Sequence, residues 1–300
     1  MSITNIMSKP EQSDVMDYVG LMKPGVMSLV IFTAIVGMLL NPVPINPIIA
    51  FVATLCIAVG SGSAGAINMW YDRDIDSIMT RTKNRPIVVG KIDQEDALAF
   101  GVVMAFFSVF VMTVCVNYLA GFLLLLTILI YVFIYTIWLK RTTPQNIVIG
   151  GISGALPPLI GWAAVSNSIS IEPLILVMII FLWTPAHFWA LALYRSEDYR
   201  KANIPMMPVK FGQDFTKIHV VIYTLLTVAC SFLPYIVRMS GVIYISSAGI
   251  LGIIFTYYAF TLIKDTNNKY APRMFFYSII YLFLIFVSIL LDHYANISFT

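Results

Sequence analysis

The residues best suited to chemistry are three polar side chains spaced four apart, Asn68, Asp72 and Asp76. On a helix this spacing puts all three on one face, whereas Asp74 points about 200° away from Asp72. Mg²⁺ prefers a few carboxylate and carbonyl oxygens together with waters and substrate phosphates. We therefore expect a magnesium site on this stripe, and we expect Asp74 to pair with basic residues instead.

Basic residues follow the stripe directly, in the form of Arg81, Lys83 and Arg85. Guanidinium and ammonium groups bind phosphate oxygens, so the combination indicates a metal–diphosphate site. The alternative is a solvated loop beside a membrane. That alternative explains the basic residues, but it does not explain the spacing of the carboxylates.

A second constellation lies in the stretch FLWTPAHFWALALYRSEDYRKANIPMMPV, residues 181–209. If the apolar segment stays helical past its end, His187, Tyr194 and Asp198 share one face. Asp198 would then be a further carboxylate at the mouth of the site, with His187 about 16 Å deeper. A titratable residue at such depth is a candidate ligand, stacking partner or base for a large aromatic molecule. The alternative is a histidine hydrogen-bonded across helices.

The composition shows what kind of element must position these side chains. Of 300 residues, 59% are hydrophobic and 11% charged, and the mean hydropathy is +0.87. Several apolar runs approach or exceed the roughly 18 residues that mark a transmembrane helix. We predict an all-α membrane protein in which residues 1–300 form a single domain. Its nine spans are expected at roughly 24–41, 48–70, 97–116, 119–138, 147–166, 173–194, 218–236, 242–263 and 274–292.

The distribution of Lys and Arg predicts the orientation. All but Arg238 of the 18 basic residues precede the first span or follow the second, fourth, sixth or eighth. Positive-inside bias then places the N-terminus and the site loops in the cytoplasm and the C-terminus on the outer side. Basic residues spread over these loops give no reason to expect a nucleic-acid partner. The first 20 residues contain three acidic residues and no arginine, unlike a mitochondrial presequence, so we expect a bacterial plasma (inner) membrane.

A weak internal repeat accompanies this pattern. The second and sixth predicted spans each lead into a long polar loop, and Asp72 and Asp198 occupy comparable places. We interpret the chain as two pseudo-repeated four-helix halves plus a ninth helix around a central cavity.

Two stretches resemble the aspartate motifs of the UbiA-type intramembrane prenyltransferase superfamily: Asn68-x-x-x-Asp72-x-x-x-Asp76 and Tyr194-x-x-x-Asp198-x-x-x-Ala202. Within that superfamily, residues 72–86, 135–165 and 183–209 are similar to the branch that farnesylates haem. The resemblance begins at residues 21–30 and extends over the first seven predicted spans. Because the second motif lacks flanking acids, metal binding on that side would depend on Asp198.

The resemblance implies a transferase that moves the farnesyl group of farnesyl diphosphate to a vinyl group of haem B. Water adds in the same conversion, and the products are haem O and diphosphate. It implies Mg²⁺ on Asn68, Asp72, Asp76 and Asp198, with Tyr194 as a further catalytic residue. The implied diphosphate-binding residues are Lys23, Arg81, Lys83, Arg85 and Lys210, and the implied haem contacts are Trp183 and His187. The implied partners are both substrates, the lipid bilayer, and haem A synthase or a terminal-oxidase assembly pathway.

Three other functions compete with this interpretation. A related prenyltransferase would act on an aromatic acid or quinone precursor, but residues 183–209 favour the haem branch. A membrane cation transporter or channel would use the carboxylates for permeation, yet they gather at one face and no predicted span has an acidic midpoint. A haem-handling assembly factor without enzymatic activity would leave the carboxylate spacing unexplained.

Overall fold

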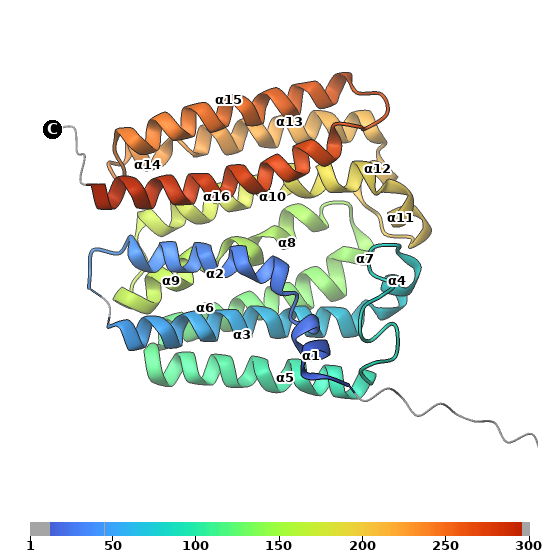
Figure 1. Ribbon diagram of the computed structural model, residues 1–300, viewed down its shortest axis with the longest axis horizontal. Helices are drawn as coiled ribbons and strands as arrows, with labels where there is room; N and C mark the ends of the chain where they lie inside the picture. Colours follow the sequence, from blue (N-terminus) through green and yellow to red (C-terminus); the bar gives the residue numbers. More distant parts are fainter. Residues whose placement is uncertain (1–12, 45, 296–300) are drawn as a thin grey trace, which may run out of the picture.

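The protein's structure is a computed structural model, which describes residues 13–44 and 46–295 (Figure 1). Every regular element in these two ranges is a helix. The two chain ends, for which the charge pattern predicts opposite sides of the membrane, lie outside the described residues.

The first part of the chain, from α1 to α7, contains two long helices in which the α-helical pitch gives way to a π-helical pitch. The elements are α1 (Val15–Leu21), α2 (Pro24–Leu39), α3 (Pro47–Tyr71), α4 (Arg73–Ile78), α5 (Gln94–Val111), η1 (Met112–Val116), α6 (Tyr118–Leu129), η2 (Ile130–Leu139) and α7 (Lys140–Thr142). The two η elements are π-helical segments that continue α5 and α6 without a break.

The second part of the chain contains five further long helical segments, some of them joined by short helices. The elements are α8 (Asn146–Ala155), α9 (Pro157–Ser166), α10 (Ile171–Tyr194), α11 (Ser196–Lys201), α12 (Met207–Lys210), α13 (Gln213–Cys230), α14 (Leu233–Ile236), α15 (Val242–Lys264) and α16 (Ala271–Ala295).

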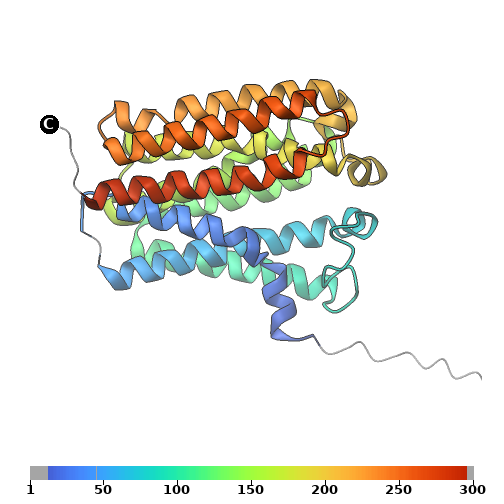
Figure 2. The ribbon, with the colours of Figure 1, turned by 45° about the horizontal axis from the view of Figure 1, so that its top comes forward.

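Eight helical segments of the described chain are long and apolar enough to cross a membrane. The count rises to nine if α1 and α2 form one span, although they are bent by 61° relative to each other (Figure 2). Helices suit this environment because they satisfy every backbone hydrogen bond internally where no water is available. The chain is therefore a multi-pass membrane protein.

Local sequence determines where the long helices begin. Asn46 precedes α3, and its side-chain oxygen accepts a hydrogen bond from the Ile48 amide at 2.8 Å, while Pro47 occupies the first helical position. Asn117 accepts from the Ala120 amide at 2.8 Å, and it alone separates η1 from α6. A single capping residue therefore turns the chain back across the membrane.

Small residues allow α2 and α9 to pack backbone against backbone. A Cβ atom added to Gly37 would lie 2.1 Å from the Pro158 carbonyl oxygen, and one added to Gly161 would lie 2.1 Å from that of Ala34. In lipid there is no hydrophobic driving force between helices, and the van der Waals packing that such close approach allows drives their association instead. It holds α2, and the residues preceding it, firmly in the bundle.

Four of the short helices gather at one end of the bundle. In Figure 1, α4, α7, α11 and α12 all lie at the end opposite the C-terminal end of α16. This end carries the two loops that follow α3 and α10, so the two aspartate-containing segments lie at the same end of the molecule.

Candidate active site

Asn68, Asp72 and Asp76 lie along one buried face, as their spacing predicts. Asp72 sits at the junction of α3 and α4 with φ −90° and ψ 8°, so a kink replaces the continuous helix that we expected. The one-turn spacing survives because the Asp72 amide donates to Asn68 O at 2.9 Å and the Asp76 amide to Asp72 O at 2.8 Å. The three residues are only 4%, 0% and 2% exposed.

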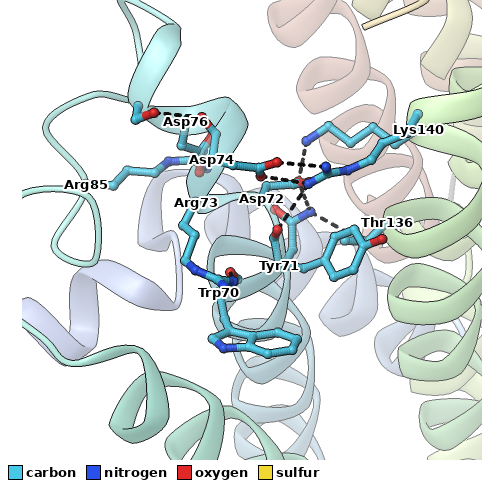
Figure 3. A network of polar contacts seen from close by, with 12 residues as sticks. Trp70, Tyr71, Asp72, Arg73, Asp74, Asp76, Arg85, Thr136 and Lys140 are labelled. Carbon is cyan, nitrogen blue, oxygen red and sulfur yellow. Dashed lines mark hydrogen bonds and ion pairs between the residues drawn. The ribbon is translucent and has the colours of Figure 1, made fainter. Parts of the chain in front are cut away.

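Both carboxylates are paired with cations. Lys140 binds Asp72 from α7, and Arg85 binds Asp76 from the loop after α4. The two cations approach from opposite sides (Figure 3). Two buried carboxylates beside two largely buried cations form an ion network whose members can also bind an anionic substrate.

Lys23 enters the same network through an unusual backbone conformation. It precedes α2 with φ 54° and ψ 59°, the left-handed region that non-glycine residues rarely occupy. Its ammonium donates to Asn68 Oδ1 at 2.6 Å. A strained residue held in this way is typical of functional sites.

Lys140 is the site residue that the sequence reasoning missed. Its charge was used only to orient the membrane spans, because it lies 68 residues from its partner Asp72. A signal was nevertheless present. Thr136 and Lys140 are four residues apart, the same spacing that identified the aspartates, and both reach the Asn68–Asp72 pair.

Asp74 has a different environment, and the prediction that it pairs with a basic residue is confirmed. Its carboxylate is 60% exposed and accepts two hydrogen bonds from the Arg141 guanidinium, both at 2.8 Å. These bonds lower the pKa of the Asp74 carboxyl. Arg141 also lies 3.6 Å from Asp72 Oδ1.

The remaining predicted diphosphate ligands lie outside this network. Arg81 and Lys83 are exposed on the loop after α4, and Lys210 is exposed at the end of α12. Among the described residues, none of the three forms an ion pair with an acidic side chain.

On the second side, the helix ends at Tyr194 as the predicted span does, so the condition that it continues to Asp198 is not met. α10 ends at Tyr194, Arg195 has φ −109° and ψ 16°, and α11 begins at Ser196. His187 and Tyr194 therefore belong to α10, whereas Asp198 belongs to α11. Asp198 Oδ1 instead accepts a hydrogen bond from Thr80 Oγ1 at 3.0 Å, which joins α11 to the loop after α4.

The three carboxylates do not share one metal-binding cluster. Across residues 13–44 and 46–295, no group of three or more His, Cys, Asp or Glu side chains could hold a metal ion together. One observation nevertheless fits Mg²⁺. Asp72 Oδ1 is buried and has no hydrogen-bond partner among the described residues. A buried carboxylate oxygen that accepts no hydrogen bond suits a cation that takes its other ligands from water and phosphate.

His187 is enclosed by packing, which leaves neither face of its ring open for a ligand to stack on. The Trp183 ring stacks on the His187 ring with centroids 4.3 Å apart, and the Phe275 ring also stacks on the His187 ring, with centroids 4.4 Å apart. His187 Nδ1 lies 2.7 Å from Ser278 Oγ, and Trp183 Nε1 donates to Ser278 O at 2.8 Å. The alternative of a hydrogen bond across helices therefore describes His187, which connects α10 to α16.

The fold and the site together define the class of protein: a helical membrane bundle with an aspartate–cation network at one end. The model of the UbiA prenyltransferase family matches residues 30–285, and the chain belongs to that family. The resemblance seen in the two aspartate motifs is thus confirmed.

Relatives within and around the family make the comparison more specific. The chain is 58% identical over 277 residues to "Protoheme IX farnesyltransferase" of Rickettsia rickettsii (strain Iowa), covering 92% of this chain and 91% of that protein. The fold is similar to that of a digeranylgeranylglyceryl phosphate synthase, with TM-score 0.78, 19% identity, and coverage of 93% of this chain and 98% of the other. It is also similar to a UbiA homologue from Archaeoglobus fulgidus bound to DMAPP and Mg²⁺, with TM-score 0.66, 18% identity, and coverage of 91% and 99%.

Proposed function

We propose that this protein transfers the farnesyl group of farnesyl diphosphate to a vinyl group of haem B, with addition of water, and releases haem O and diphosphate. The observation that supports prenyl transfer is the buried Asp72, with one unsatisfied oxygen, among Lys23, Lys140 and Arg85. The choice of haem as acceptor is supported by the name of the Rickettsia relative, which matches 92% of this chain.

The diphosphate is the group that the cations of the site would bind. Although the three carboxylates do not form one cluster, we keep Asn68, Asp72, Asp76 and Asp198 as the residues that would hold Mg²⁺ together with the diphosphate oxygens. Mg²⁺ would neutralise charge on the leaving diphosphate and so lower the barrier to breaking the allylic C–O bond. Three further cations already lie at these residues: Lys23, Lys140 and Arg85. They would add positive charge at the phosphate oxygens.

The exposed cations would act earlier, during capture of the substrate. Arg81, Lys83 and Lys210 lie on the surface of the end that carries the site. Their charge attracts an anionic head group from the aqueous phase, an effect that salt screens. We assign them to diphosphate binding in this sense, distinct from the buried cations.

Tyr194 is our candidate for stabilising the allylic cation. It ends α10 beside the kink, and the Arg195 guanidinium lies 5.3 Å from its ring centroid. A ring that already attracts a guanidinium has the electrostatics to stabilise a carbocation. Water must be kept from this cation until the carbon–carbon bond forms, and a membrane-embedded site helps to exclude it.

Haem, the acceptor, would contact the edge of the His187 ring. Both ring faces are covered and Nδ1 is engaged by Ser278, so Nε2 is left to contact haem, with Trp183 holding the ring in place. Stacking of the porphyrin on His187 would require Phe275 or Trp183 to move. Changed haem affinity in His187→Ala would support an acceptor contact.

For the whole chain, we propose a single domain of nine spans in two four-helix halves plus a ninth helix around a central cavity, the bent α1–α2 pair counting as the first span. The N-terminus and the loops of the site would face the cytoplasm of a bacterium, and the C-terminus the outer side of the inner membrane. Haem A synthase or a terminal-oxidase assembly pathway would receive the product.

The direct test is a reconstituted reaction. Purified protein is incubated with haem B, farnesyl diphosphate and Mg²⁺, and haem O is sought by mass spectrometry, with chelator added to a parallel sample. Haem O formed only with Mg²⁺ supports the proposal. No haem O, together with prenylation of 4-hydroxybenzoate, would reassign the chain to prenyl transfer onto aromatic acids.

A further inference from the structure

Thr136 lies beside the proposed metal site without belonging to it. It is completely buried in η2, and its Oγ1 takes part in two hydrogen bonds. Oγ1 donates to the Tyr131 carbonyl oxygen at 2.8 Å and receives a bond from Asn68 Nδ2 at 3.1 Å. Figure 3 shows Thr136 on the same side of the cluster as Lys140.

The direction of these bonds fixes the Asn68 amide. A hydroxyl has one proton, and Thr136 uses it on Tyr131, so only a lone pair faces Asn68. The Asn68 NH₂ group has two protons, and it donates one to Thr136 and one to Asp72 Oδ2 at 2.7 Å. Oδ1 is thereby directed at the Lys23 ammonium, 2.6 Å away.

The opposite orientation of the amide is unfavourable at each contact. It would place Oδ1 against the Asp72 carboxylate and the Thr136 lone pair, and NH₂ against the Lys23 ammonium. Like-sign contacts among buried groups are costly because little solvent screens them. Removing the Thr136 oxygen would leave one Asn68 proton without its partner and weaken this preference.

The π-helical pitch of η2 accounts for the geometry. Thr136 bonds to the carbonyl five residues earlier, whereas Thr127 in α6 bonds in the ordinary way to Leu123 O, four residues earlier, at 2.8 Å. π-helical turns inside longer helices are frequent at functional sites. Here the changed pitch brings the Thr136 hydroxyl to α3.

We propose that Thr136 is a positioning residue, which fixes the Asn68 amide so that Oδ1 stays on the side of Lys23, from which both groups would bind the Mg²⁺–diphosphate group. This inference rests on the proposed function. Outer-shell hydrogen bonds of this kind orient the ligands of metal ions, and their loss costs about 10- to 100-fold in metal affinity or activity.

The test compares four proteins: wild type, Thr136→Val, Thr136→Ser and the matched control Thr127→Val. Thr127 is also buried in the same continuous helix, and Thr127→Val also removes a bond from Oγ1 to a backbone carbonyl. The Thr127 hydroxyl forms no hydrogen bond with Asn68 among the described residues. The probe is a farnesyl thiodiphosphate, which does not react. Thermal stabilisation by the probe is measured against Mg²⁺ concentration, and kcat and KM are measured separately with farnesyl diphosphate.

Thr136→Val should require about 10-fold more Mg²⁺ for half-maximal stabilisation by the probe. Thr136→Ser should restore the wild-type midpoint, and Thr127→Val should leave it unchanged. An unshifted midpoint in Thr136→Val, or an equal shift in Thr127→Val, overturns the inference. If Thr136→Val does not fold, Thr136→Ala replaces it, and equal midpoints in the Ala and Ser variants overturn the inference.

Two outcomes separate this inference from the proposed function. If wild-type protein shows no Mg²⁺-dependent stabilisation by the probe, both are wrong. If wild type responds and Thr136→Val responds identically, only the role of Thr136 is wrong. In an Asn68→Ala background, Thr136→Val should add no further shift, because the residue through which it acts is gone.

Discussion

At the scale of single residues, environment separates three aspartates that are close in sequence. Asp72 and Asp76 are buried against Lys140 and Arg85, whereas Asp74 is exposed and held by Arg141. Exposed ion pairs contribute little, about 0–1 kcal/mol, whereas a buried carboxylate deprived of its charge leaves a buried cation unpaired. The same substitution should therefore have very different effects at these positions.

The first prediction compares Asp72→Asn with Asp74→Asn. Turnover should fall by about 100-fold or more in Asp72→Asn, the scale on which charge-stabilising groups act. It should stay within about fivefold of wild type in Asp74→Asn, which loses only an exposed pair. Haem O formation is measured on protein of matched monodispersity. Equal losses in both variants would contradict the separation of roles drawn from burial.

The residue types and spacing made half of this site predictable. The shared face of Asn68, Asp72 and Asp76 could be predicted from their four-residue spacing, because that spacing is a property of one helix. Lys140 and Thr136 could not be assigned in this way, because their contacts with Asn68 and Asp72 depend on how η2 packs against α3. Spacing along a chain predicts neighbours on one element but not across two.

At the scale of elements, the two breaks after α3 and α10 matter most. Apolar periodicity predicts the helices well, but it does not predict the breaks at Asp72 and Arg195, because both residues follow the apolar stretch from which the periodicity is read. The kinks allow the following loops to meet. Ile75 and Met79 belong to the same buried cluster as Tyr199 and Ile204, and the Thr80–Asp198 bond lies beside it.

The second prediction tests that connection between loops. Thr80→Val removes the hydroxyl that bonds Asp198, which should lower kcat/KM by about fivefold, the equivalent of about 1 kcal/mol for a partly exposed bond to a charge. Hydrogen exchange of residues 79–93 should rise at the same time. Ser77→Ala is the control, because its hydroxyl donates to Asp74 O within α4 itself and does not reach α11. Unchanged exchange in Thr80→Val would show that the bond does not hold the loops together.

The third prediction concerns the contact between α2 and α9. Gly161→Ala places a methyl group 2.1 Å from the Ala34 carbonyl oxygen, so the helices must separate, at a typical cost of about 1–3 kcal/mol. Its thermal midpoint in detergent should fall. Gly154→Ala is the matched control, because a Cβ there meets nothing within 4 Å and alanine favours the helix. A fall of equal size in both variants would indicate a general intolerance of alanine in this region.

At the scale of the whole molecule, the site lies where the apolar interior of the bundle reaches its polar end. The described chain buries its apolar interior in two large clusters, one centred on α10, α13, α15 and α16 and the other on α2, α3, α6 and α9. The polar network lies at one end of both. A farnesyl chain and a porphyrin partition into the bilayer while a diphosphate stays at its surface, so one end of a membrane bundle is where the three can meet.

The last prediction concerns the side of the membrane on which that end lies. Single cysteines are introduced at Lys83, on the loop after α4, and at Arg238, after α14, in a chain from which Cys56, Cys115 and Cys230 have been removed. Both positions are exposed. Positive-inside bias predicts that a membrane-impermeant maleimide labels position 238 in intact cells and position 83 only after permeabilisation, because the predicted spans put 17 of the 18 basic residues on the side of Lys83. Labelling of position 83 in intact cells would invert the topology. It would also place diphosphate binding on the outer side, where a cytoplasmic supply of farnesyl diphosphate could not reach it.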